Sequence, residues 1–290
     1  MSFGRGTLVA VVRALVTPFK PLVEALAQCE AGLSAAWAAS AHHRLMLVQW
    51  GLPPVPEHFD HSIDIFYLWR KTRNPQGIER GIFGGLALQG GDVLELACGD
   101  GFNARNFYSV RSKRVVACDF DFRAIRTAKR KNRAPNVGFV QADIRNDMPE
   151  GLFDNVVWDA AIEHFTPAEV TEILMRIKTR LRAGGVLSGH TIVKRADGRK
   201  SLSYHEYEFR SKEDLYECLH PYFRHVSVFE TIYPNVHNLY FWASDGTIPF
   251  APEWPHVITG RTLSVPLQDE PRSSTRTSPS SLPPPSSPRV

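Results

Sequence analysis

An acidic residue followed by a glycine-rich turn is the part of this 290-residue sequence that points most clearly to chemistry. Val93 to Leu96 is a short apolar run interrupted by Glu95, and Gly99 and Gly101 follow it. Glycine tolerates a positive φ and lets a ligand approach the backbone closely. The first amides of a following helix favour anionic or electron-rich groups. The stretch therefore predicts a strand, a tight turn and a helix N-terminus that together bind a ligand.

Acidic residues also stand at the ends of the next three predicted strands. Asp119 lies about 20 residues beyond the turn, where a carboxylate can accept both hydroxyls of a ribose. Phe120 beside it can cover one face of a purine ring, and Asp143 can accept a hydrogen bond from the amino group of adenine. The fourth strand ends at Asp159. Because α/β folds bind ligands at the carboxyl ends of their strands, this pattern predicts a nucleoside site.

Three histidines near these strand ends are candidates for removing a proton from an oxygen or nitrogen atom. An imidazole titrates near neutral pH, which suits a general base. His164 follows the fourth strand, His190 lies on the fifth, and His205 lies beyond it. We predict His164 or His205 as the catalytic residue, with a packing or surface role as the alternative for each.

The apolar pattern after Asp92 predicts the elements that would position these side chains. Strands and helices alternate with short connections, which indicates βαβ units and a mostly parallel sheet. Thr166, Pro167 and Glu169 have the types and spacing of a helix start with a capping box. The last two strands are separated by only a turn, so they must be antiparallel. The predicted strands span 93–97, 114–118, 137–140, 154–159, 186–193, 226–231 and 237–244, with helices at 102–111, 121–132, 167–182 and 211–219.

With these residues in place, residues 90–245 resemble the class I S-adenosylmethionine-dependent methyltransferases. The resemblance rests on the acid and glycine turn, the acids at the following strand ends, Gly184-Gly185 before the fifth strand, and the closing hairpin. It implies a Rossmann-like, doubly wound α/β sheet, mostly parallel with a C-terminal antiparallel hairpin, in the order 3-2-1-4-5-7-6. The implied cofactor is S-adenosyl-L-methionine.

The resemblance also assigns roles to individual residues. Ala97 stands where the family has its first turn glycine, a departure that narrows the turn. Asp119 falls on the ribose-binding acid, Phe120 on the adenine-stacking residue, and Asp143 with Ile144 on the adenine contact. The implied cofactor-binding residues are Glu95, Ala97, Gly99, Gly101, Asp119, Phe120, Asp143, Ile144 and Asp159.

Two other functions fit parts of this pattern. Gly99, Gly101 and Ala104 also satisfy the glycine pattern of NAD(P)-dependent Rossmann oxidoreductases. Glu95 disfavours that alternative because it would repel a pyrophosphate, whereas a cationic sulfonium ligand with an ammonium group would be attracted. A non-catalytic module that only binds S-adenosylmethionine is the second alternative, since a fold does not fix a function.

Composition limits the classes of methyl acceptor and indicates the cellular compartment. The formal net charge of +4 is mild, and no strongly basic face is evident, so we expect no nucleic-acid partner. The four cysteines form no C-x-x-C pair, which favours free thiols in a reducing, cytoplasmic compartment and predicts no metal site. The histidines and aspartates of 57–70 do not match a compact zinc motif either. A small molecule, a sugar or a lipid-linked compound is the expected acceptor.

The remaining segments are predicted to flank the enzyme domain at 57–250. Residues 1–52 form an N-terminal extension of several helices that packs on the main domain or touches a membrane surface. Arg13 interrupts the apolar run at 7–16, which we therefore interpret as part of the mature chain. Residues 57–90 are expected to cap the ligand pocket of the core at 91–250, and the Ser- and Pro-rich segment 266–290 is expected to be disordered.

Overall fold

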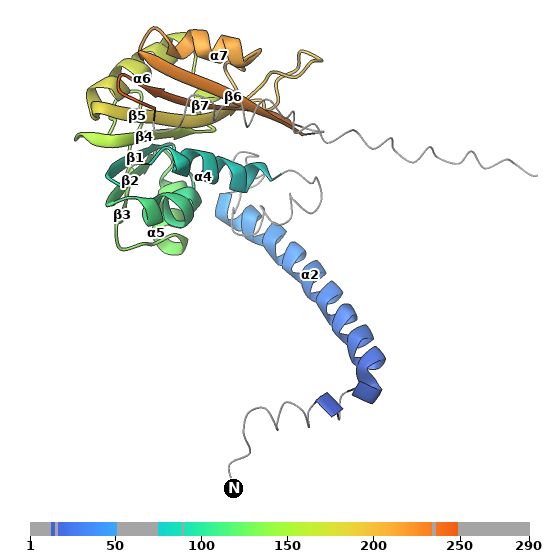
Figure 1. Cartoon of the computed structure of the whole chain (residues 1–290). Helices are drawn as coiled ribbons and strands as arrows, with labels where there is room; N and C mark the ends of the chain where they lie inside the picture. The colour runs from blue at the N-terminus through green and yellow to red at the C-terminus, as the bar shows by residue number, and fades with distance from the viewer. Residues whose placement is uncertain (1–12, 15–16, 51–74, 89, 234–235, 249–290) are drawn as a thin grey trace, which may run out of the picture.

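The computed structural model describes residues 13–14, 17–50, 75–88, 90–233 and 236–248. A seven-stranded sheet forms its centre, in the order β3-β2-β1-β4-β5-β7-β6 (Figure 1). The first five strands are parallel, and β7 pairs antiparallel with both β5 and β6. The predicted order is therefore confirmed. The strands are β1 (Asp92–Leu96), β2 (Arg114–Asp119), β3 (Val137–Gln141), β4 (Phe153–Asp159), β5 (Leu181–Ile192), β6 (His225–Tyr233) and β7 (Val236–Ser244).

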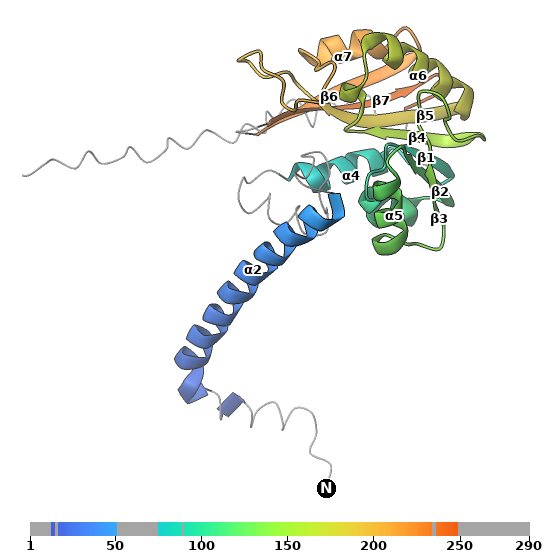
Figure 2. The same ribbon diagram turned by 180° about the vertical axis from the view of Figure 1, so that it is seen from behind.

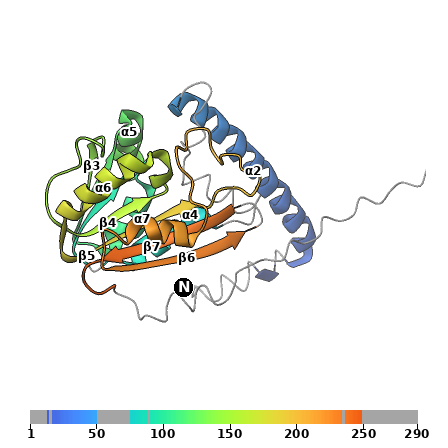
Figure 3. The same cartoon turned by 90° about the horizontal axis from the view of Figure 1, so that it is seen from above.

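Helices cover both faces of the sheet because successive strand residues point to opposite sides. On one face, α6 (Pro167–Arg180) and α7 (Lys212–Leu219) pack against the strands and overlie the sheet in Figure 3. On the other face lie α4 (Gln76–Leu86), α5 (Phe122–Lys131) and the π-helical turn η2 (Ala104–Tyr108). Two short 3-10 turns, η3 (Ser109–Arg111) and η4 (Ile162–His164), complete the connections.

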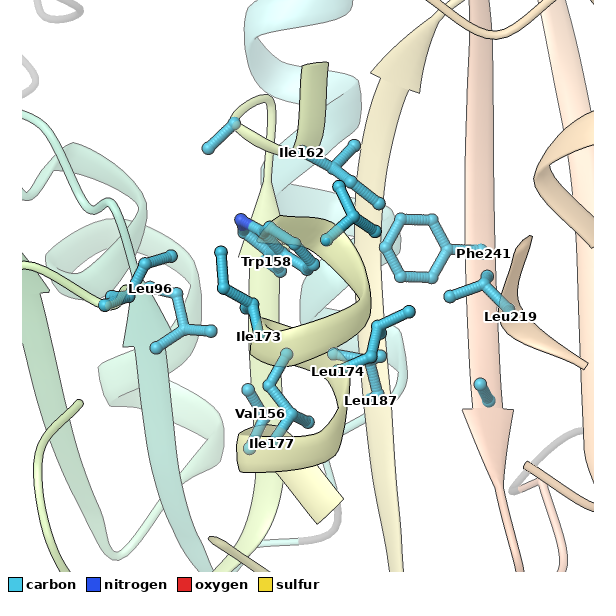
Figure 4. Close-up of a cluster of buried hydrophobic side chains, with 14 of the residues drawn as sticks. Leu96, Val156, Trp158, Ile162, Ile173, Leu174, Ile177, Leu187, Leu219 and Phe241 are labelled. Carbon is cyan, nitrogen blue, oxygen red and sulfur yellow. The ribbon is translucent and has the colours of Figure 1, made fainter. Parts of the chain in front are cut away.

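The larger core lies between the sheet and the α6–α7 layer. Trp158 of β4 is completely buried at its centre and is surrounded by aliphatic side chains of β1, β5 and α6 (Figure 4). Trp158 precedes Asp159, so the packing that fixes the end of β4 also fixes the carboxylate that follows it. Thr166 and Glu169 form the predicted capping box at the start of α6.

Two segments of the enzyme domain differ in detail from the sequence-based expectation. The chain is helical over the expected span 102–111, but its hydrogen bonds are π-helical at Ala104–Tyr108 and of the 3-10 type at Ser109–Arg111. The helix expected at 167–182 ends at Arg180, and residues 181–185 already belong to β5. The turn residues 234–235 and the predicted segments at 1–12, 57–74 and 266–290 lie outside the described residues.

The N-terminal extension contains one long helix instead of the several expected between 21 and 50. After the 3-10 turn η1 (Thr17–Phe19), α2 runs unbroken through Lys20–Trp50. Its alanine-rich composition has the highest helix propensity, and one Gly32 costs too little to break it. The helix projects away from the sheet (Figures 1 and 2), and Leu22, Leu26, Leu33 and Trp37 are exposed. These described side chains do not pack on the domain.

Gly189 of β5 should tolerate no side chain. A Cβ added there would lie 2.0 Å from the carbonyl oxygen of Trp158 and 2.5 Å from the ring of Phe241. We expect Gly189→Ala to lower the free energy of unfolding by about 1–3 kcal/mol, because the strands must separate to admit the methyl group. Urea unfolding measures this. Gly138→Ala in β3, where the nearest atom is 4.0 Å away, is the matched control and should change little. Equal stability of the two variants would contradict the close approach.

Candidate active site

The glycine-rich turn leaves the end of β1 with three residues in the left-handed region. Ala97 and Gly99 have φ of 54°, and Gly101 has φ of 75°. A Cβ on Gly101 would lie 2.5 Å from the ring of Phe139, so both the backbone angle and the space require glycine there. Ala97 adopts the same left-handed backbone conformation despite its methyl group. The turn therefore keeps its shape although alanine stands where the family has glycine.

Asp119, at the end of β2, stabilises this turn through a hydrogen bond. Its Oδ2 accepts a hydrogen bond of 2.9 Å from the Gly99 amide, and its Oδ1 accepts one of 2.9 Å from the Asp121 amide. Burial raises the pKa of Asp119, while the two backbone donors lower it. Phe120 beside it is 65% exposed, so its ring is available to a planar ligand.

Glu95 is a buried carboxyl group that faces other acids. Burial raises its pKa well above the ordinary value, and the negative charges of Asp159 and Asp100 raise it further, against the opposing effect of Arg80. Its Oε2 atom is buried and accepts no hydrogen bond from any of the described residues. A buried carboxyl group with one oxygen that accepts no hydrogen bond indicates a site for a cationic or hydrogen-bond-donating ligand group.

Asp159, at the end of β4, is paired with a cation from outside the glycine turn. Its Oδ2 accepts hydrogen bonds of 3.0 Å from Arg80 of α4 and 3.0 Å from the Asn103 amide group. The Arg80–Asp159 pair is nearly inaccessible, with side-chain exposures of 13% and 5%. Sequence reasoning missed Arg80 and Asn103. The only available signal was a basic residue within the segment 57–90, which was expected to cap the ligand pocket.

His190 lies beneath this site and is held neutral. Its Nδ1 is 3.7 Å from Asp159, and its Nε2 lies 3.3 Å from the Asn238 side-chain oxygen and 3.4 Å from the Gln76 amide nitrogen. Burial lowers the pKa of His190 to about 4, although Asp159 opposes the shift. The ring is 1% exposed, so the structure places it in a buried polar network away from solvent.

Asp143 and Ile144 follow β3 at the same edge of the sheet. The Asp143 carboxylate is bonded by the Arg145 guanidinium at 2.7 and 3.0 Å, and these side-chain hydrogen bonds hold its pKa below the ordinary value. Ile144 is 4% exposed and packs in the core. A contact from Asp143 to adenine therefore stays a prediction, and it would share the carboxylate with Arg145.

The two predicted catalytic histidines come together. His164 of η4 and His205, from the β5–α7 connection, have ring centroids 4.9 Å apart with the planes at 78°. His205 is 1% exposed, and its Nδ1 lies 2.6 Å from Glu208 Oε1. The backbone amides of Glu206 and Tyr207 bond the carbonyl of Glu163, which ties the two segments together.

The strand order excludes the simpler dinucleotide-binding arrangement. A doubly wound oxidoreductase sheet has the order 3-2-1-4-5-6. Here β7 lies antiparallel between β5 and β6.

Comparison with known proteins agrees with the methyltransferase interpretation. Residues 93–185 match a family model described as a methyltransferase domain. Among curated proteins, no match is found. Similar solved structures include DhpI in complex with S-adenosylhomocysteine, with 23% identity over 64% of this chain and 89% of that chain and a TM-score of 0.48. The N-methyltransferase NodS from Bradyrhizobium japonicum WM9, with the same ligand, is 19% identical over 61% of this chain and 91% of that chain, with a TM-score of 0.48. Human N-acetylserotonin methyltransferase with S-adenosylmethionine is 16% identical over 65% of this chain and 57% of that chain, with a TM-score of 0.48.

The matched segment and the strand order define the class. Residues 93–185 carry a methyltransferase domain, and the strand order is the one implied by the resemblance to class I S-adenosylmethionine-dependent methyltransferases. S-adenosyl-L-methionine is the cofactor of this class, and the family resemblance seen in the sequence is confirmed.

Proposed function

We propose that the enzyme binds S-adenosylmethionine over the glycine turn and methylates an oxygen or nitrogen atom of a small molecule, a sugar or a lipid-linked acceptor. The observation that carries the proposal is the group of buried carboxyl groups at this edge, Glu95, Asp119 and Asp159. The salt bridge of Arg80 is made to Asp159, and among the described residues none donates a hydrogen bond to Glu95 Oε2. A ligand with an ammonium and a sulfonium charge would supply what the site lacks.

Each proposed contact follows from the position of a side chain. Glu95 and the Gly99–Gly101 backbone would hold the methionine end of the cofactor. Asp119 would accept the ribose hydroxyls, and Phe120 would stack on adenine. Asp119 now accepts from two amides, so it is already oriented before a ligand arrives.

The chemical step is an in-line displacement at the sulfonium. The acceptor forms a new bond to the methyl carbon, and the carbon–sulfur bond breaks with its electron pair going to sulfur. The products are the methylated acceptor and S-adenosylhomocysteine, whose sulfur is neutral, and the proton of the acceptor passes to a histidine at the site or to solvent. His164 and His205 lie together beyond β4, where their Nε2 atoms can act on the acceptor.

Two features support the acceptor class. The net charge of +4 over 290 residues is weak for a nucleic-acid enzyme. The exposed apolar side chains of α2 could contact a lipid, so lipid-linked compounds are included among the proposed acceptors. No helix among the described residues is long and apolar enough to span a bilayer.

The decisive test uses the purified full chain. We expect mass spectrometry of the denatured protein to release S-adenosylmethionine or S-adenosylhomocysteine, and calorimetry to show S-adenosylmethionine binding without NAD binding. Acceptors can then be screened with methyl-labelled cofactor. Binding of NAD in place of S-adenosylmethionine would refute the cofactor site, while cofactor binding without transfer to any acceptor class would favour the non-catalytic module.

A further inference from the structure

A second cluster of functional side chains lies beside the proposed cofactor site. Glu163 and His164 belong to η4, and His205 approaches from the β5–α7 connection. One ligand atom from each of these residues lies within 4.8 Å of the other two. Glu163 and His205 are 3% and 1% exposed, and His164 is partly exposed. Two imidazoles and a carboxylate thus converge just after the end of β4, and the His164 side is partly exposed to solvent.

Every member of this cluster is held by a further partner. His205 Nδ1 lies 2.6 Å from Glu208 Oε1, and His164 Nδ1 lies 3.3 Å from the carbonyl oxygen of Tyr204. Glu163 Oε2 accepts a hydrogen bond of 3.0 Å from the Thr191 hydroxyl. Histidines that bind metals almost always direct the other ring nitrogen to a carboxylate or a carbonyl. With Nδ1 donating in both rings, both Nε2 atoms are free to act as ligands.

Glu208 is itself fixed in place, which makes the support around His205 rigid. Its Oε1 also accepts a hydrogen bond of 2.6 Å from the Ser201 amide, and its side chain is 2% exposed. A buried carboxylate this close to Nδ1 makes the opposite ring nitrogen more electron-rich. A packing role for His205 would not require that arrangement.

We propose that Glu163, His164 and His205 bind a divalent transition-metal cation such as Zn²⁺. Two imidazoles with one carboxylate suit borderline metals and leave positions open for a substrate. Magnesium, by contrast, prefers oxygen ligands alone. Ligands of a tetrahedral Zn²⁺ lie about 3.3 Å apart, and the three ligand atoms lie within 4.8 Å of one another, so side-chain rotation brings them to the coordination distance when the cation binds. This inference departs from the sequence-based expectation that the protein holds no metal.

The role of the cation rests on the proposed function. A metal at this place would coordinate the acceptor oxygen or nitrogen, lower its pKa and orient it toward the methyl group. The proton would pass to solvent, so neither histidine would need to accept it. Glu208 acts through His205 and is a positioning residue.

Metal content of the full chain tests the site directly. The protein is stripped with a chelator, dialysed against Zn²⁺ and analysed for bound metal. We expect about one Zn²⁺ per chain, as for a three-ligand site. His164→Ala and His205→Ala should each lose it, and Glu208→Gln should weaken binding about 10- to 100-fold. His220→Ala, which changes an exposed histidine outside the cluster, should bind as the unmodified protein does. Co²⁺ should also give visible absorption that His205→Ala abolishes.

Calorimetry with S-adenosylmethionine, run on the same samples, shows that each variant is folded and separates the two proposals. Metal binding that depends on the cluster, with no methyl transfer, supports the metal site while the proposed function fails. Cofactor binding and methyl transfer by a protein that takes up no Zn²⁺ or Co²⁺ overturn the metal site. Equal metal uptake by the unmodified protein and the two alanine variants, or binding of Mg²⁺ alone, also overturns it.

Discussion

Replacing Asp159 with alanine should lower the free energy of unfolding by about 3–5 kcal/mol. Asp159 pairs with Arg80 at 3.0 Å inside the protein, where the Arg80 side chain is only 13% exposed. Removing one partner of such a pair leaves an uncompensated charge in a poorly solvated place, and that cost exceeds the worth of the pair itself. Urea unfolding followed by circular dichroism measures the loss.

Two companion variants show whether the orphaned charge is the cause. Asp159→Asn keeps a hydrogen-bond acceptor for Asn103 and should lose less stability than alanine. The double variant Arg80→Met with Asp159→Leu removes both charges and should recover much of the loss. If the double variant loses as much as the sum of its single changes, the two residues are not coupled and the explanation is wrong.

Replacing Glu95 with glutamine should weaken S-adenosylmethionine binding roughly 10- to 150-fold, since a hydrogen bond to a charged group contributes about 1.5–3 kcal/mol.

Glu95 also makes binding depend on pH. Its raised pKa means that part of the free protein carries a proton on this carboxyl above the ordinary range. A cationic ligand favours the ionised form, so binding releases the proton. Affinity should therefore rise with pH, by at most tenfold per unit, until the pKa of the free protein is passed.

Calorimetry in buffers of different ionisation enthalpy counts the released proton. Glu95→Gln should abolish both the release and the pH slope, and the exposed Glu172→Gln should leave them unchanged. S-adenosylhomocysteine lacks the sulfonium charge, so its affinity should respond less to Glu95→Gln. Equal affinity of the unmodified protein and Glu95→Gln for S-adenosylmethionine would remove Glu95 from the site.

The capping box and the acids at the strand ends could be predicted because each is encoded in a short stretch of sequence, whereas the strand order followed from the family resemblance. Thr166 and Glu169 are three residues apart, and Asp119 is the last residue of its largely apolar strand. Arg80 could not be assigned in this way, because its partner Asp159 is 79 residues away. Which buried acid meets which cation depends on the closed sheet and not on local pattern.

The meeting of His164 and His205 shows the same limit. The sequence marked each histidine separately, but only the folded β5–α7 connection brings the rings to 4.9 Å and adds Glu208. The prediction of several helices between 21 and 50 was wrong for a local reason. The sequence between 21 and 50 alternates apolar and small residues, and its uniformly high helix propensity favours a single helix over several.

Helix α4 has adjacent residues anchored to two separate strands of the sheet, the central β4 and the edge strand β6. Arg80 reaches Asp159 of β4, while Glu79 accepts hydrogen bonds from Thr231 and Tyr233 of β6. The segment that matches the methyltransferase family begins only at residue 93. A protein cut to that boundary would lose both anchors and leave Asp159 without its cation. The smallest unit able to fold must therefore start at or before Gln76, upstream of the sequence by which the family is recognised.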